Sequence, residues 1–193
     1  GDMEGVQEKI ADMVKETFII TSGQHLTNSL LDNGEKPSVI SAVLKQQSTE
    51  RARTVINHGM DIMGGSAICM GKNNILASSY IQSPIGITVE GSNTLTRSLI
   101  IFGQGLMRSH PYLLNLVDSI ENDKQDEFMK NVKLLIKDSV KNTIISVFPF
   151  PYKSNEEELI RLSKSFSLAS NMMLLMGKKF KTAEMLSGRY ADI

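Results

Sequence analysis

The sequence predicts an all-α protein, built as an antiparallel helical bundle. Apolar residues recur at spacings of three and four along most of the 193 residues, which is the period of an amphipathic helix. No alternation of Val, Ile and Thr is long enough to form a sheet. Hydrophobic residues make up 41% and charged residues 22% of the chain, and these proportions are typical of a folded globular protein.

The first two helices are predicted at 3–33 and 37–63. Each carries apolar residues along one side. Asn33-Gly34 separates them, because glycine favours a helix end, and Pro37 suits the first turn of the second helix. Gly64-Gly65 is expected to end that helix.

The middle of the chain is less regular. Residues 66–91 are expected to be mostly irregular, with a short helix around 75–80. The helical period returns at 92–109, and His110-Pro111 ends that helix because a residue before proline avoids α geometry. A polar loop then leads into a helix at 123–146.

The last helix follows the strongest helix breaker in the chain, Phe148-Pro149-Phe150-Pro151. We therefore expect two domains, a helical bundle at 1–148 and an additional helical extension at 149–193. Ser154 and Glu157 form a capping box for a helix at 155–186. Its apolar seam is expected to be buried against other helices or a second subunit, and consists of Leu159, Leu162, Phe166, Met173 and Met176.

Charge and cysteine content narrow the range of partners. The chain has 21 Lys and Arg and 21 Asp and Glu, so its formal charge is zero, and no nucleic-acid partner is expected. The single Cys69 cannot form an internal disulfide, which favours a reducing, cytoplasmic compartment. Any membrane association is expected to involve parts outside this chain. The first and last residues suggest an expressed piece of a longer protein.

No metal site is expected. His25, His58 and His110 lie in three different elements without ligand spacing. Cys69 has no basic neighbour to activate it as a nucleophile, so we expect it to be a small buried hydrophobe.

Two segments suggest chemistry. Asp61 is followed closely by Gly64-Gly65, where a phosphate or an adenine ring can approach the backbone; a plain helix cap is the alternative. Glu90 precedes Gly91 at the start of a helix, in an apolar stretch. Apolar surroundings and a helix N-terminus act on a carboxylate in opposite directions, which suits a general base. The alternative is a carboxylate that only caps the helix.

Several strings, in order, resemble one family. V-E-G-S-N-T-L-T-R at 89–97 resembles the acyl-CoA dehydrogenase signature, written roughly [YF]-E-G-T-x-x-I-x-R. D-I-M-G-G-S-A, upstream, is similar to the family's Q-I-L-G-G-x-G. G-E-K-P-S-V-I-S-A and T-R-S-L-I-I-F-G-Q-G resemble the bacterial long-chain branch, whose extra C-terminal helical region looks like residues 151–193. The resemblance covers nearly the whole chain.

This resemblance implies an activity. Glu90 matches the base that removes the α-proton of a fatty acyl-CoA thioester in β-oxidation, while the β-hydride passes to FAD. Gly91 matches the glycine beside the thioester. An electron acceptor for the reduced flavin and a homo-oligomer are implied as partners.

The resemblance also implies a set of residues that bind FAD. Ser92 and Thr94 match positions that contact FAD. Gly64 and Gly65 match glycines that approach the adenosine part of FAD from a neighbouring subunit, and Asp61 stands where many relatives have Gln.

An interaction module is the alternative to an enzyme. Full-length relatives also have an N-terminal helical domain and a middle β-domain, which this sequence does not resemble, so the piece alone should not hold FAD tightly. Asp61, Ser92 and Ala67 depart from the usual Gln, Thr and Gly, which favours a degenerate bundle kept for assembly. Glu90 and Gly91, together with Arg97, match the motif and favour the enzyme.

Overall fold

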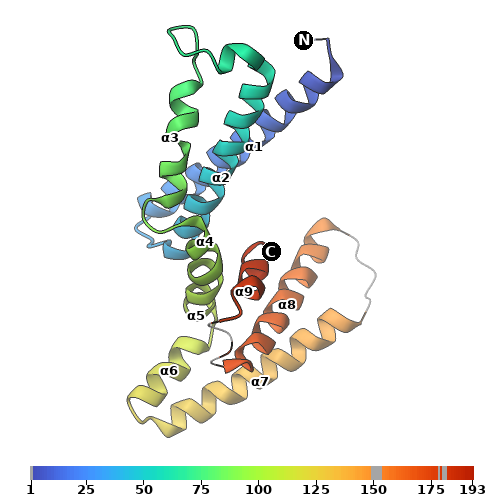
Figure 1. The fold of residues 1–193 in the computed structure, drawn as a ribbon. Helices are drawn as coiled ribbons and strands as arrows, with labels where there is room; N and C mark the ends of the chain where they lie inside the picture. The colour runs from blue at the N-terminus through green and yellow to red at the C-terminus, as the bar shows by residue number, and fades with distance from the viewer. Residues whose placement is uncertain (1, 149–153, 178, 180–181) are drawn as a thin grey trace. The chain divides into compact units, whose positions relative to one another are not determined.

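The computed structural model describes residues 2–148, 154–177, 179 and 182–193. The chain divides into two compact units, Gly1–Ile101 and Phe102–Ile193. Helices and turns make up the described residues, and no strand occurs among them (Figure 1). The predicted all-α class is confirmed. In the described part of the chain, no helix has the length and apolar character needed to cross a membrane.

The first unit is built on a helical hairpin. α1 (Glu4–Asp32) and α2 (Ser38–Met63) lie side by side in opposite directions (Figure 1). Between them Gly34 adopts a φ of 80°, and the Glu35 N–H returns to the Leu30 carbonyl at 3.0 Å. Both helices and the Asn33-Gly34 stop are as predicted.

An ion pair links the two helices of this hairpin. Glu16 on α1 is only 9% exposed, and its carboxylate accepts a hydrogen bond from Nη1 of Arg51 on α2. Lys15 adds a second cation, with Nζ 3.3 Å from Glu16 Oε1. The Arg51 hydrogen bond, followed by that from Lys15, lowers the pKa of Glu16 below its ordinary value of 4.5.

The expectation of an irregular stretch at 66–91 is wrong in its second half. α3 (Ala77–Thr88) follows a short 3₁₀ turn at Gly64–Ala67 and a loop. The side chain of Asn74 starts α3, because its Oδ1 accepts from the N–H groups of Leu76 and Ala77 at 3.0 and 2.9 Å. A helix is therefore present where a short one was expected around 75–80, but it begins at Ala77 and continues to Thr88.

The segment predicted as a helix at 92–109 is helical from Asn93 to Ser109. It comprises α4 (Asn93–Leu95), wider π-helical turns at Thr96–Gln104 and α5 (Gly105–Ser109). His110 is extended, with φ −73° and ψ 128°, which confirms the stop before proline.

Four further helices lie in the described part of the second unit. α7 (Gln125–Val147) and α8 (Asn155–Leu174) pack against each other in opposite directions (Figure 1). α6 (Leu113–Glu121), which the sequence analysis missed, packs on α7, and α9 (Glu184–Ala191) is separate from α8. The helix predicted at 155–186 is therefore two helices, and Gly177 with a φ of 53° lies in the turn after α8.

The structure describes the end of α7 at Phe148 and the start of α8 at Ser154. Ser154 Oγ accepts from the Glu157 N–H at 3.3 Å, so the predicted cap is present. Phe148 ends α7 in an extended conformation, and 149–153 lie outside the described residues. The domain boundary at 148/149 stays a prediction.

The apolar seam of α8 is only partly buried. Met173 is 5% exposed, and Phe166 is half-buried beside Phe102 and Tyr190, with ring centroids 6.2 and 6.0 Å away. Leu159 and Leu162 are 64% and 50% exposed. These two leucines are not buried within the chain, and their burial by a second subunit stays a prediction.

Polar side chains join α7 to α8. Asn142 is fully buried, and its Nδ2 donates to Asp138 Oδ2 at 3.0 Å and to Ser167 Oγ at 3.2 Å. Asn171 Nδ2 donates to Ser139 Oγ at 3.0 Å one turn away. The pair of helices is therefore held in register by directional bonds as well as by apolar contact.

Replacing Asn142 by alanine should destabilise the second unit by about 1–3 kcal/mol, because Ser167 and Asp138 lose a buried donor. Urea unfolding measures this change. Asn131→Ala is the control, since Asn131 Nδ2 bonds only the Glu127 carbonyl of its own helix. Equal losses for both variants would contradict the role given to Asn142.

Replacing Glu16 by glutamine should remove a pH-dependent part of the stability. The folded-state pKa of Glu16 is lowered, so its contribution is present above about 4.5 and is lost as the pH falls through the folded value. Urea unfolding from about pH 7 to about pH 3 should show the wild-type advantage shrinking with acid. Glu8→Gln on the exposed face of α1 is the control, and a constant advantage would contradict the assignment.

Candidate functional site

The candidate site is the tight turn that joins α3 to α4. α3 ends at Thr88, and Val89 is extended with ψ 144°. Glu90 and Gly91 then adopt φ values of 57° and 95°. Glycine adopts positive φ freely, whereas glutamate rarely does. The turn joins α3 to α4 within a few residues, and the Glu90 side chain is exposed on it.

Ser92 caps the helix that follows. Its backbone is extended, with φ −60° and ψ 149°, and its Oγ accepts from the Leu95 N–H at 3.2 Å. The Thr96 N–H bonds the Ser92 carbonyl at 2.9 Å. This N-cap fixes where helix geometry begins, directly after the Glu90–Gly91 turn.

Side chains of α2 bind the turn through hydrogen bonds. Lys45 Nζ donates to the Gly91 carbonyl and to Asn93 Oδ1, both at 2.7 Å. Asn93 is buried, and its Nδ2 donates to Thr49 Oγ1 and Glu50 Oε1, both at 2.9 Å. The roles of Lys45 and Asn93 are not predictable from the sequence, because no local pattern connects residues more than 40 positions apart.

Glu90 itself is exposed. Among the described residues, no hydrogen bond or ion pair to its carboxylate is present in the structure. The preceding Val89 is 51% exposed, so the apolar surroundings expected from the sequence are not supplied within this unit. What the unit does supply is a carboxylate on a fixed backbone, open to an approaching molecule.

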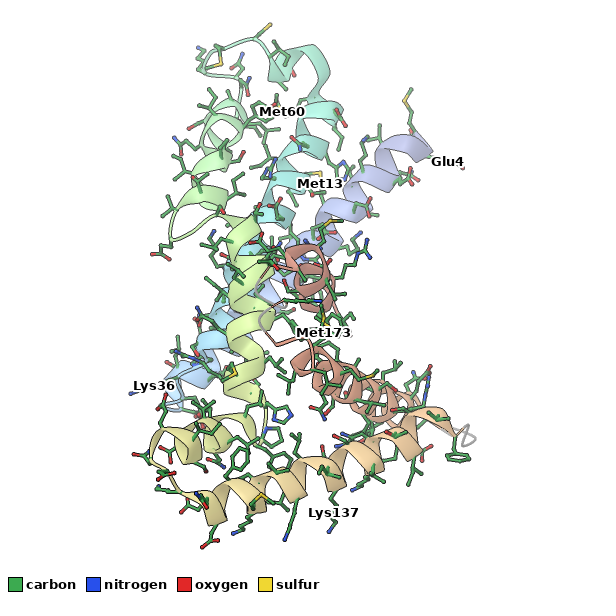
Figure 2. All side chains as sticks on the ribbon, turned by 60° about the horizontal axis from the view of Figure 1, so that its bottom comes forward. Glu4, Met13, Lys36, Met60, Lys137 and Met173 are labelled. Atoms are coloured by element: carbon green, nitrogen blue, oxygen red, sulfur yellow. The ribbon has the colours of Figure 1, made fainter. Side chains whose placement is uncertain are left out.

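The paired glycines lie at the other end of α2. Gly64 ends α2 with φ 57° and ψ −134°, which confirms the predicted cap. A Cβ on Gly64 or Gly65 would meet nothing within 4 Å, so another molecule can approach this backbone. Figure 2 labels Lys36 just before α2 and Met60 near its end. At 1.5 Å per residue, Gly64 lies about 28 Å along the helix from Lys45.

Asp61 is engaged within the chain. Its carboxylate accepts a hydrogen bond from Lys9 Nζ of α1 at 2.9 Å. This hydrogen bond and the Lys9 charge lower the pKa of Asp61, so the side chain is anionic at neutral pH and acts only as an acceptor.

The remaining predicted contact positions are open. Ser92 and Thr94 are both exposed. The structure brings Glu90, Gly91, Ser92 and Thr94 together, and leaves Asp61 and the glycine pair at the far end of the hairpin.

Cys69 and the histidines have no shared site. Cys69 is exposed, so the expectation that it is buried is wrong; it follows the Gly64–Ala67 turn and lies in a loop rather than on a packed helix face. Among the described residues, no group of three or more His, Cys, Asp or Glu could hold a metal ion. His110 is a structural link within the second unit, with Nε2 2.8 Å from Asn171 Oδ1.

An apolar groove runs along the hairpin. It has a volume of about 650 Å³, and several of the side chains that line it are strongly exposed, including Phe18 at 71%. The lining consists of Ile10, Met13, Val14, Thr17, Phe18, Val55, Gly59, Ile62, Met63, Ile75 and Leu76.

Comparison with known families gives two matches. Residues 1–103 match the family model described as acyl-CoA dehydrogenase, C-terminal domain. Residues 107–193 match the model described as acyl-CoA dehydrogenase, C-terminal, bacterial type. No solved structure matches the chain significantly.

Proposed function

Since the chain belongs to the acyl-CoA dehydrogenase family, we propose that it is the C-terminal part of an FAD-dependent enzyme that desaturates fatty acyl-CoA thioesters. In this proposal Glu90 is the general base and Gly91 lies against the thioester. The observation that carries it is the Glu90 turn: an exposed carboxylate held in a backbone conformation that glutamate rarely adopts.

That conformation supports a role beyond helix capping. A non-glycine residue at positive φ costs about 1–3 kcal/mol and persists where its surroundings hold it. The cap of α4 is already provided by Ser92, so Glu90 is not needed to start the helix. The hydrogen bonds from Lys45 to Gly91 and Asn93 compensate this strain. The strained conformation leaves the Glu90 carboxylate exposed.

The chemistry assigned to Glu90 is a proton abstraction. The bond from the α-carbon to its hydrogen breaks, the proton goes to a Glu90 carboxylate oxygen, and the electron pair forms the new α,β double bond. When bound, FAD accepts the hydride that leaves the β-carbon. A carboxylate without an internal partner keeps its lone pairs available for this proton.

The residues assigned to FAD fit the cofactor to different degrees. Gly64 and Gly65 leave open space where a Cβ would stand, which suits close approach of a cofactor to the backbone. Ser92 accepts a bond from Leu95, and its O–H stays available to donate. Asp61 fits less well, because it is held by Lys9 and lacks a donor.

The position of these residues supports an oligomeric enzyme. Ser92 and Thr94 lie near the start of α2, whereas Gly64 and Gly65 follow its end, about 28 Å further along. We assign the two sets to two FAD molecules, with the glycine pair reaching the cofactor of a neighbouring copy. An acceptor must also reoxidise the flavin after each turnover.

An assembly module without catalysis is the second candidate. The engagement of Asp61 with Lys9 favours it, as does the replacement of the family's Thr by Ser92. Both candidates share the fold and the oligomer, and they differ in whether Glu90 has a chemical role.

The decisive prediction concerns Glu90→Gln in the full-length natural protein. The substitution keeps the side-chain shape but removes the proton acceptor, so flavin reduction by a fatty acyl-CoA should slow by roughly 10²–10⁴-fold. Bleaching of the oxidised flavin absorbance in stopped flow measures this rate.

Glu35→Gln is the matched control, since Glu35 is an exposed glutamate of the same unit. FAD content and thermal unfolding should be unchanged in both variants. A Glu90→Gln protein that bleaches at the wild-type rate would exclude Glu90 as the base and favour the assembly module.

Self-association is the second prediction from this assignment. The chain leaves large apolar side chains exposed, among them Phe18, Ile81 and Leu159, and such surfaces usually mark interfaces. Sedimentation equilibrium should give a dimer or a larger species. A monomeric mass that persists as the protein concentration rises would contradict the oligomer.

A further inference from the structure

Lys45 donates hydrogen bonds to the turn that follows Glu90. It is half-buried on α2. Its Nζ contacts the carbonyl of Gly91 and the side chain of Asn93, both at 2.7 Å. The ammonium therefore holds the residues on both sides of Ser92.

The second end of the Asn93 side-chain amide is also hydrogen-bonded, which fixes the orientation of the group that Lys45 contacts. The Asn93 amide uses its oxygen for Lys45 and its nitrogen for Thr49 and Glu50. Both ends of the amide are satisfied, so its orientation is fixed by α2 alone. Hydrogen bonds from a charged donor are shorter and about twice as strong as neutral ones.

The Gly91 carbonyl is the group that ties this network to Glu90. The Gly91 carbonyl belongs to the peptide unit shared with Ser92, one unit after the Glu90–Gly91 peptide, and the Gly91 φ of 95° is one of the two torsions that set the orientation of these units relative to each other. Among the described hydrogen bonds, the one from Lys45 is the bond that fixes the Gly91 carbonyl. Without it, we expect Glu90 to relax from its positive φ, because that conformation is less stable for glutamate.

We infer that Lys45 is a positioning residue for the Glu90 carboxylate. It touches no reacting atom; it acts by fixing the Gly91 carbonyl and Asn93, and so the direction in which Glu90 points. This inference rests on the proposed function of Glu90 as a base.

The test is Lys45→Met in the full-length FAD-loaded protein, because methionine keeps most of the aliphatic stem and removes the donor. Displacing a catalytic group by about 1 Å costs on the order of 10²-fold in rate. We expect kcat for flavin reduction by acyl-CoA to fall roughly 10- to 100-fold. KM should stay within about two-fold, because the loss acts on the transition state rather than on substrate binding.

Lys45→Arg separates positioning from general stability. A guanidinium can donate to two oxygens at once, so Lys45→Arg should recover most of kcat. Lys36→Met is the control, since Lys36 is exposed just before α2 (Figure 2) and should leave kcat unchanged. If Lys45→Met gives no folded protein, Lys45→Gln, which stays polar but is too short for both oxygens, replaces it.

Amide hydrogen exchange gives a readout apart from activity. The peptide covering 89–96 should exchange faster in Lys45→Met than in Lys36→Met, while peptides from α1 exchange equally. Wild-type kcat and unchanged exchange in Lys45→Met would overturn the inference. So would a loss of kcat that Lys45→Arg does not recover.

Glu90→Gln distinguishes a failure of the inference about Lys45 from a failure of the proposed function. If Glu90→Gln stops flavin reduction and Lys45→Met does not, only the role of Lys45 fails. If Glu90→Gln reduces flavin at the wild-type rate, the proposed function fails and the role of Lys45 fails with it.

Discussion

The first unit depends on one short polar stretch of α2, residues 45–51. Within two turns it supplies Arg51 to the Glu16 carboxylate of α1 and Lys45 and Glu50 to the segment around Asn93. Removing one partner of a buried pair leaves an uncompensated charge, which costs far more than the pair contributes. The same stretch therefore fixes both the packing of α1 against α2 and the start of α4. The position of the Glu90 turn depends on α2 through these contacts.

This dependence explains why the unit presents a carboxylate but not a complete pocket. The turn is built from within, whereas the glycine pair lies at the opposite end of α2 with open space around it. A ligand that uses both must be shared between copies or reached through other parts of the protein. The apolar groove along the hairpin and the exposed leucines of α8 show the same feature: surfaces of this chain that a single copy does not cover.

The sequence predicted those parts that local patterns determine. The helices at 3–33 and 37–63 follow from long apolar stripes that end at glycine, and Ser154 follows from its spacing to Glu157. Only a short helix around 75–80 was predicted where α3 extends from Ala77 to Thr88. The start of α3 depends on the Asn74 side chain, and its close approach to α2 depends on Gly86, where an added Cβ would lie 3.2 Å from the Thr49 side chain. The Glu90 motif was visible, but its support was not: Lys45 and Gly91 meet only through the fold.

The energies involved indicate that the Glu90 turn is formed before any ligand arrives. A left-handed glutamate costs about 1–3 kcal/mol. Each hydrogen bond to a charged group contributes about 1.5–3 kcal/mol, and Lys45 makes two of them, to Gly91 and Asn93, while the Ser92 cap adds about 1 kcal/mol. The favourable contributions match or exceed the strain, so binding energy is not needed to create the conformation. In its proposed role as the base, Glu90 does not have to be reoriented in each catalytic cycle, and the substrate's binding energy remains available for the reaction itself.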